Sequence, residues 1–318
     1  MKQTRDLAEL QWTLEGHTPY LWLLEWVHGA GFGAEERCID VRPVPATVPG
    51  SVQGALREAG IIPDWNSAVN SRESEWVENR HWMYRTRIPA EWLDPDKRFR
   101  LECQGLDYAG WIYINGQEVG AFRGTHVPHE FDITPYLNAA ENELDIIFDL
   151  APRWLGQFGY TSQMREWKTR FNYTWDWTPR LVQVGIWDSI SLVASSNSEF
   201  GTLRCLADAD PKAGHGILEL AADITEGGAE TARISLEGDG GPIRCVEVTV
   251  AEFAQGITWS ELPVQLWWPN LQGEQPLYTV TCVLLDAQGA ELDRETRRVG
   301  FKHVEWVPCE GAPAEADP

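Results

Sequence analysis

The stretch GWIYINGQEVGAF, residues 110–122, decides the fold class. Apolar and polar residues alternate on both sides of Asn115-Gly116, which is the pattern of a β-hairpin. Both central positions of a two-residue hairpin turn need positive φ, and Asn followed by Gly is the pair that adopts it most readily. The stretch therefore predicts two antiparallel strands, Gly110 to Asn115 and Gln117 to Phe122.

The same period of two continues around this hairpin. It predicts further strands at residues 82–88, 99–104, 143–150 and 186–193. Before them, Ser51 can cap a short helix that ends at Gly60 and places Val52, Ala55, Leu56 and Ala59 on one face. Residues 1–194 are therefore expected to form an antiparallel β-sandwich of the jelly-roll kind, covered by one helix.

The composition changes at ASSNS, residues 194–198, which is typical of a linker. Four clean alternations follow it, one of which, Val246/Val248/Val250, predicts a strand that ends at Val250. A last strand is expected at residues 292–301. About seven short strands in this part of the chain favour an immunoglobulin-like β-sandwich over residues 199–306. The segment 307–318 is rich in Pro, Ala and Glu, and we expect a linker or a disordered tail there.

Composition narrows the possible partners. The net charge of −22, with no run rich in Lys or Arg, would repel nucleic acid and anionic membranes. The amino terminus lacks the features of a signal peptide, and no apolar run is long enough to span a membrane, which predicts a cytoplasmic protein. The 17 tryptophans hint at stacking against carbohydrate. Six widely spaced cysteines are expected to be free buried thiols: Cys38, Cys103, Cys205, Cys245, Cys282 and Cys309.

No cofactor or metal site is expected from the motifs. The glycines of residues 29–33 follow no β-α unit and lack the G-x-G-x-x-G spacing of a nucleotide loop. His126 and His129 stand before Glu130, but Pro128 prevents the helical spacing that an H-E-x-x-H zinc motif needs.

The stretch FNYTWDWTPRLVQVGIWD, residues 171–188, looks most like a binding site. An extended W-D-W would send the indoles of Trp175 and Trp177 to one side and the carboxylate of Asp176 to the other. A sugar suits that arrangement, because its C–H face stacks on an aromatic ring while its hydroxyls donate to a carboxylate. The alternative is a buried aromatic cluster in which Asp176 forms a salt bridge with Arg180.

Taken together, several segments resemble the amino-terminal part of family 2 glycoside hydrolases and, within that family, the β-mannosidase branch. They occur in the family's order and cover most of residues 48–302: VPGSVQGALREAGIIPDW (48–65), WVENRHWMYRT (76–86), GLDYAGWIYINGQEVG (105–120), FDITPYL (131–137), NYTWDWTPRLVQVGIWDSI (172–190), LWWPNLQGEQPLYTV (266–280) and RRVGFK (297–302).

The resemblance implies a modular enzyme: a sugar-binding, galactose-binding-like jelly roll, an immunoglobulin-like domain, and then a (β/α)₈ barrel that carries both catalytic glutamates of a retaining mechanism. No segment here matches the barrel motifs, so no catalytic residue is assigned, and we expect this chain to be inactive without the barrel. Glu73, Glu75 and Glu78 are expected to form a solvated acidic face.

The resemblance also implies roles around the W-D-W loop in the subsite for a terminal β-mannoside. Trp175 would stack on the sugar, Asp176 would accept hydrogen bonds from its hydroxyls, and Arg180 would anchor the loop that also holds Trp177. Thr174 and Thr178 stand in flanks where the family more often has glycine.

Asn70 is a further candidate for the same sugar, and its alternative role is to satisfy a loop turn. Three alternatives to the leading function remain open. They are a stand-alone carbohydrate-binding module, a non-enzymatic assembly protein, and another family 2 specificity such as β-galactosidase or exo-β-glucosaminidase.

Overall fold

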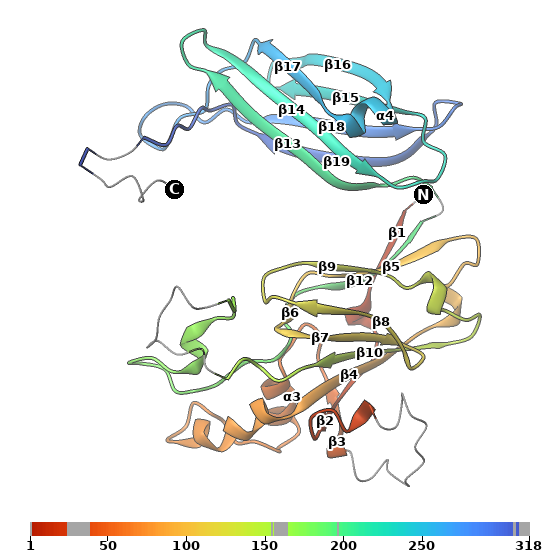
Figure 1. Ribbon diagram of the computed structural model, residues 1–318, viewed down its shortest axis with the longest axis vertical. Coiled ribbons are helices and arrows are strands. Elements are labelled where there is room, and N and C mark those ends of the chain that lie inside the picture. Colours follow the sequence, from red (N-terminus) through yellow and green to blue (C-terminus); the bar gives the residue numbers. More distant parts are fainter. Residues whose placement is uncertain are drawn as a thin grey trace. The chain divides into compact units, whose positions relative to one another are not determined.

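A computed structural model describes residues 2–23, 39–153, 155, 165–195, 197–307 and 310–311 of the chain. These residues form two compact units, Gln3–Ala194 and the residues from Ser195 onward (Figure 1). Both units are built almost entirely from antiparallel strands. The predicted all-β class, with one β-sandwich after another, is therefore confirmed.

The first unit contains two main sheets. Their strand orders are β1-β12-β5-β9 and β3-β2-β4-β10-β7-β8, and β11 pairs separately with β6. The strands are β1 (Gln3–Asp6), β2 (Trp12–His17), β3 (Ile39–Ala46), β4 (His81–Ile88), β5 (Arg98–Cys103), β6 (Leu106–Asp107), β7 (Ala109–Ile114), β8 (Gln117–Arg123), β9 (His129–Asp132), β10 (Asn142–Phe148), β11 (Gly185–Ile186) and β12 (Ile190–Ser195). The helices are α3 (Val52–Glu58) and the 3-10 turns η1 (Leu7–Glu9), η2 (Asn70–Asn79), η3 (Ala90–Trp92), η4 (Thr134–Tyr136) and η6 (Arg170–Tyr173).

The hydrophobic core of the first unit lies between the two main sheets. Alternate residues of the central strands β4 and β10, including Trp82, Tyr84 and Phe148, are fully buried there. Strand side chains alternate between the two faces, so the period of two in the sequence corresponds to this inner face. The hairpin of β7 and β8 turns at Asn115 and Gly116 with φ of 51° and 74°, which confirms the predicted turn.

Backbone hydrogen bonds join the start of helix α3 to the chain that follows the W-D-W stretch. Ser51 caps it by accepting a hydrogen bond from the Gly54 amide at 3.1 Å, as predicted. The amide of Val52 donates to Val184 O at 2.8 Å, and the Gly50 amide donates to Ile186 O at 2.6 Å. Gly185, with φ of 149°, has no room for a side chain, since a Cβ would come within 2.6 Å of Gly50 O. The approach of these two segments therefore requires glycine at position 185.

The outer face of the six-stranded sheet carries a buried layer of charge. Asp145 is fully buried on β10 and accepts a hydrogen bond from Nε of Arg85 at 2.7 Å. Glu15 and Glu143 also lie within 3.7 Å of the Arg85 guanidinium. Burial raises the pKa of Asp145 to about 7, although Arg85 acts in the opposite direction. Three carboxyl groups thus share one guanidinium, with Asp145 and Glu15 buried and Arg85 and Glu143 partly exposed.

The second unit is a sandwich of a three-stranded sheet, β13-β14-β17, and a four-stranded sheet, β16-β15-β18-β19. Its elements are β13 (Phe200–Asp210), β14 (His215–Ile224), β15 (Thr231–Gly238), β16 (Gly241–Thr249), α4 (Val250–Gln255), β17 (Ile257–Leu262), β18 (Tyr278–Leu285) and β19 (Glu291–Val299). Alternate residues of the paired strands, among them Leu218, Ile234 and Cys282, fill its core. Two sheets with seven strands match the immunoglobulin-like architecture.

Several finer predictions differ from the structure. Val250 begins the short helix α4 instead of ending a strand, because Thr249 and Glu252 form a reciprocal capping box. The strand expected over residues 186–193 is interrupted, and β11 and β12 belong to different sheets. The thiols of Cys103, Cys205, Cys245 and Cys282 are free, but Cys245 is exposed.

Some predictions fall outside the described residues, namely the glycine cluster 29–33, Cys38, Cys309 and most of the segment 307–318. Within the described part of the chain, no helix is both long and apolar enough to cross a membrane.

Candidate functional site

The W-D-W motif forms a tight turn at the edge of the first unit. The amide of Trp175 donates to Thr178 O at 3.2 Å, and the Thr178 amide donates back to Trp175 O at 3.3 Å. Asp176 and Trp177 occupy the two central positions. The extended W-D-W expected from the sequence is therefore wrong. The two indoles nevertheless lie together, because the turn brings their ring centroids to 5.8 Å at an interplanar angle of 75°.

The flank before the turn is in an unfavourable backbone conformation. Thr174 has a φ of 126°, a region that glycine adopts easily and a β-branched residue rarely does. Its hydroxyl donates to Thr178 O at 3.2 Å, and the Thr178 hydroxyl donates to Phe171 O at 3.1 Å. The two threonines that flank the motif thus donate hydrogen bonds across the base of the turn. These bonds offset part of the strain at Thr174.

Arg180 anchors the turn from below. Its guanidinium donates to both carboxylate oxygens of Glu78, with distances of 2.8 to 3.1 Å, and lies over the buried ring of Tyr173 at 5.0 Å from its centroid. A bidentate pair of this kind is among the stronger hydrogen-bonding arrangements. The expectation of a fully solvated acidic face is wrong for Glu78, although Glu73 and Glu75 are exposed. The alternative salt bridge between Asp176 and Arg180 is also absent.

A second, buried anchor holds the chain that leads into the turn. The ammonium of Lys168 is fully buried, donates to Asp107 Oδ1 at 2.5 Å and donates to the carbonyl oxygen of Gln183 at 2.6 Å. The hydroxyl of Thr125 donates to the same Asp107 oxygen at 2.8 Å. Burial lowers the pKa of Lys168, while the neighbouring carboxylate opposes the change. Both legs of the loop, at Lys168 and at Gln183, are thus tied to the sheet.

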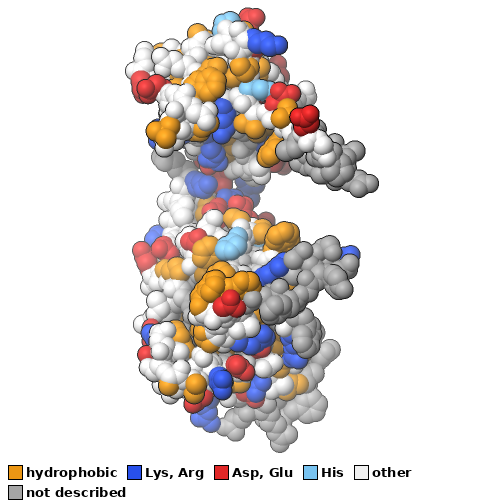
Figure 2. All heavy atoms as spheres, turned by 90° about the vertical axis from the view of Figure 1, so that its left-hand side faces the viewer, with side chains coloured by type: hydrophobic (Ala, Val, Ile, Leu, Met, Phe, Trp, Pro, Cys, Tyr) orange, Lys and Arg blue, Asp and Glu red, His pale blue; other side chains and the backbone are white. Residues whose placement is uncertain are grey.

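The groups that the turn exposes combine aromatic rings with one free carboxylate. Trp175 is 38% exposed and Trp177 is 76% exposed. Asp176 is exposed and, among the described residues, its carboxylate has no hydrogen-bond or ion-pair partner. The rings line a hollow of about 580 Å³ together with Arg170, Phe171 and Thr178. Figure 2 shows hydrophobic side chains gathered around an acidic one on this unit.

This arrangement can bind a polyhydroxylated ring. Aromatic faces pack against C–H groups, and a free carboxylate accepts hydrogen bonds from hydroxyls. The sequence analysis did not identify four residues that contribute to the loop, namely Lys168, Glu78, Arg170 and Phe171. Their partners lie far away in the chain or become visible only once the turn forms, so no local pattern in the sequence identifies them.

The other candidates from the sequence lie elsewhere. The side-chain amide of Asn70 donates to Asp64 O at 3.1 Å, within its own loop. Glu78, at the other end of η2, is the residue that contacts the loop, because it accepts hydrogen bonds from Arg180. His126 packs edge-on against Trp187, and His129 packs against Phe122 and Phe131. Within the described ranges, no three His, Cys, Asp or Glu side chains cluster as metal ligands would.

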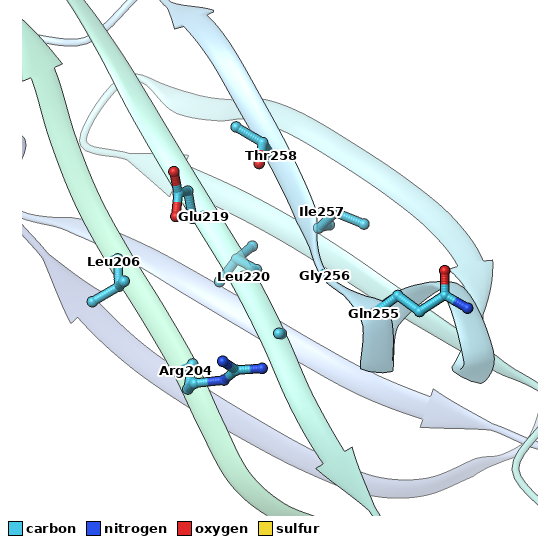
Figure 3. A pocket seen from close by; sticks show the side chains of 9 residues that line it. Arg204, Leu206, Glu219, Leu220, Gln255, Gly256, Ile257 and Thr258 are labelled. Carbon is cyan, nitrogen blue, oxygen red and sulfur yellow. The ribbon is translucent and has the colours of Figure 1, made fainter.

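The second unit has a smaller hollow of about 240 Å³ on its three-stranded sheet. Arg204 and Leu206 of β13, Glu219 of β14 and Thr258 of β17 are among the residues that line it (Figure 3). None of the site residues expected from the sequence lies in it. The W-D-W turn therefore remains the candidate site.

Two family models match the chain. Residues 32–188 match the galactose-binding domain-like model of glycosyl hydrolase family 2, and residues 202–302 match the model described as glycosyl hydrolases family 2. The first contains the whole W-D-W turn and both of its anchors, and the second covers most of the seven-stranded sandwich.

Among curated proteins, β-mannosidase B of Thermothelomyces thermophilus is 27% identical over 83% of this chain and 33% of its own length. β-Mannosidase B of Emericella nidulans is 27% identical over 82% of this chain and, again, 33% of its own length. The chain thus spans about a third of the length of these relatives.

Among solved structures, the β-D-mannosidase of Dictyoglomus thermophilum matches 95% of this chain and 36% of its own, with a TM-score of 0.70 and 23% identity. This likeness concerns the fold. Both family models and the sequence relatives agree, and the chain therefore belongs to glycoside hydrolase family 2, in which its sequence relatives are β-mannosidases.

Proposed function

We propose that this chain is the sugar-recognising, non-catalytic amino-terminal portion of a retaining glycoside hydrolase that acts on terminal β-mannosides. In this proposal Trp175 stacks on the C–H face of the terminal sugar, and Asp176 accepts hydrogen bonds from its hydroxyls. Arg180 positions the turn through Glu78 and does not itself touch the sugar. Asn70 is left out of the subsite, because its amide is already bonded within its own loop.

The observation that carries the proposal is the free carboxylate of Asp176 beside a half-exposed indole. An exposed acid is unremarkable by itself, and most exposed aromatic rings occur singly. Here two anchors hold an unfavourable turn whose tip presents both groups at once. The relatives named β-mannosidase supply the sugar class. The neutral sugar also agrees with the strongly negative net charge, which would repel an acidic ligand.

The catalytic step is proposed to lie outside the matched domains. Family resemblance places both glutamates in a barrel, and the barrel has no counterpart in the two sandwiches. This chain alone should therefore bind a β-mannoside weakly and not hydrolyse it. Turnover of an aryl β-mannoside by the purified chain would contradict the non-catalytic assignment.

A stand-alone carbohydrate-binding module is the second candidate. It is favoured by the exposed rings of Phe171 and Trp177, which form a hollow without any contribution from another domain. The two candidates differ in affinity. A self-sufficient module should bind a manno-oligosaccharide well below millimolar concentration, whereas half of a shared subsite should bind in the millimolar range.

The test is a titration of the ¹⁵N-labelled chain with methyl β-mannoside, followed by the indole N–H signals of its tryptophans. We expect the Trp175 signal to shift, and Asp176→Asn to weaken binding about tenfold or more, because a hydrogen bond to a charged group contributes about 1.5–3 kcal/mol. Asp239→Asn is the matched control, since Asp239 is an exposed turn carboxylate in the second unit. Equal affinities of wild type and Asp176→Asn, or no shift at Trp175, would contradict the proposal.

A further inference from the structure

We propose that the hollow on the three-stranded sheet of the second unit is a separate binding site for a neutral glycan, in which one hexose is held between Arg204 and Glu219. All residues that line this hollow belong to the second unit. The inference therefore goes beyond the proposed function, which assigns sugar contacts to the first unit alone. The chemistry also differs from that of the W-D-W turn, because none of the described residues that line this hollow is aromatic.

The hollow exists because two small residues stand next to each other on the outer face of the sheet. Ala221 of β14 is 8% exposed, and a Cβ at Gly256, where α4 ends, would lie 3.7 Å from that of Ala221. The φ of Gly256 is 108°, so the backbone itself disfavours a side chain there. The volume of about 240 Å³ lies below the 300–1,000 Å³ of ordinary ligand pockets and suits a single small ring. Longer side chains surround the two small residues, namely Arg204, Leu206, Glu219, Gln255, Ile257 and Thr258 (Figure 3).

Two opposite charges beside the hollow remain unpaired. Arg204 stands opposite Ala221, two residues along β14 from Glu219, so both charged residues lie on the same face as diagonal neighbours. Long side chains can reach across such a diagonal, yet no ion pair joins these two, and among the described residues neither side chain has a hydrogen-bond partner. On the four-stranded sheet, by contrast, Arg233 and Glu247 are paired at 3.2 Å. The guanidinium and the carboxylate at the hollow thus keep their donors and acceptors for a ligand.

The mixture of groups favours a neutral ligand that is rich in hydroxyls. An anion would be attracted by Arg204 and repelled by Glu219, and a cation would meet the reverse. A sugar hydroxyl, in contrast, both accepts from a guanidinium and donates to a carboxylate. Gln255 and Thr258 add an amide and a hydroxyl whose side chains have no partner in the described part of the chain. Leu206, which is 64% exposed, supplies the apolar surface on which the C–H groups of one hexose pack.

The test is a titration of the ¹⁵N-labelled chain with β-1,4-linked mannotriose, followed at the side-chain amide of Gln255 and the backbone amide of Gly256. The Gln255 signal is identified by its absence in Gln255→Glu. We expect both signals of wild type to shift at millimolar sugar, and Glu219→Gln to weaken this binding about tenfold. Ala221→Leu should abolish the binding by filling the hollow, and urea unfolding verifies that the variant is folded. Glu237→Gln, which changes an exposed carboxylate of β15, is the matched control and should leave the affinity unchanged.

The remaining outcomes would overturn the proposal. If mannotriose shifts neither signal, or if wild type, Glu219→Gln and Ala221→Leu bind it equally, the hollow is not a glycan site. If the free amino acid alanine shifts both signals and mannotriose does not, the hollow takes a zwitterion instead.

The first-unit variant Asp176→Asn separates this proposal from the proposed function. We expect it to leave the Gln255 shift unchanged. If it abolishes that shift, the signal reports binding at the first unit, and a separate site is refuted. A Gln255 shift without any shift at Trp175 would contradict the proposed function and support the second site.

Discussion

The turn at Asn115-Gly116 and the turn at Asp176-Trp177 each reverse the chain within two residues, but different forces hold them. In the first, both central residues have positive φ and are of types that adopt it readily. In the second, neither central residue has positive φ, and the strained angle falls on Thr174 before the turn. The backbone preferences of Asn115 and Gly116 themselves stabilise the first turn, whereas contacts with residues far away in the sequence stabilise the second.

This difference separates a structural turn from the turn that we propose to bind sugar. The side chain of Asn115 is used within the unit, since its amide donates to Asn142 Oδ1 at 2.7 Å and to Tyr136 O at 3.0 Å. Asp176 and Trp177, in contrast, project outward with nothing around them among the described residues to satisfy the carboxylate. Strain that persists at an exposed site needs support from the surrounding structure, and Lys168 and Arg180 provide it.

The largest expected effect comes from removing the buried support. Lys168→Ala leaves Asp107 buried without its cation, and breaking a buried pair on one side costs about 3–5 kcal/mol. We expect the free energy of unfolding of the first unit to fall by that amount in urea titrations, and sugar-induced shifts at Trp175 to vanish. Arg294→Ala, which breaks an exposed ion pair in the second unit, should change stability by no more than about 1 kcal/mol.

The double variant Lys168→Ala/Asp107→Ala sharpens this result. If the loss comes from an uncompensated charge, the double variant should be less destabilised than the sum of the two single changes. Simple additivity would mean that packing, and not the ion pair, holds the loop.

The same comparison shows how far sequence reasoning reaches. Asn115-Gly116 and the Ser51 cap were predictable because the physical cause lies within a few residues. The partner of Arg180 was not, because Glu78 lies 102 residues away and only the folded chain brings them together. The W-D-W motif was expected in the right part of the chain but with the wrong backbone. The alternation of aromatic and polar residues in the motif is typical of a strand. The hydrogen bonds between Trp175 and Thr178 form a turn instead, and contacts with neighbouring segments stabilise it.

Helix α4 was missed for a different reason. The run before it alternates like a strand, and that pattern outweighed the Thr249 to Glu252 capping box. The charge layer around Asp145 was also hidden, because a polar residue in an alternating strand predicts a solvated face. Here Glu15 and Asp145 are buried on that face instead, beside the partly exposed Arg85.

Asp145 supplies the second prediction, since it is a buried acid that contrasts with the free Asp176. Its pKa is raised to about 7 in the folded chain, against about 3.9 for an unfolded Asp. Between these values the folded state holds a proton that the unfolded state has lost. Asp145 therefore makes stability fall as pH rises from about 4 to 7, by up to about 1.4 kcal/mol per pH unit.

Asp145→Asn removes this titration. We expect urea unfolding at several pH values to show that the free energy of unfolding of wild type falls relative to that of Asp145→Asn as pH rises from about 4 to 7. Parallel curves for wild type and Asp145→Asn would show that Asp145 is ionised throughout.

The smallest effects come from exchanging the residue types of the two turns. Gly116→Ala places a Cβ at a φ of 74°, with open space around it, and should cost about 1–2 kcal/mol from backbone strain alone. Thr174→Gly relieves a φ of 126° but loses the hydroxyl bond to Thr178 O and adds freedom to the unfolded chain. We therefore expect a net stabilisation of at most about 1 kcal/mol.

Sugar binding should separate the two substitutions further. Gly116→Ala should leave the indole shifts of Trp175 unchanged, because its hairpin does not carry the site. Thr174→Gly should weaken binding severalfold while the protein becomes no less stable, since a relaxed flank no longer fixes the direction of Asp176. If Thr174→Gly lowers both stability and affinity, the threonine hydroxyl is the dominant contribution, and the strain at this position is small in comparison.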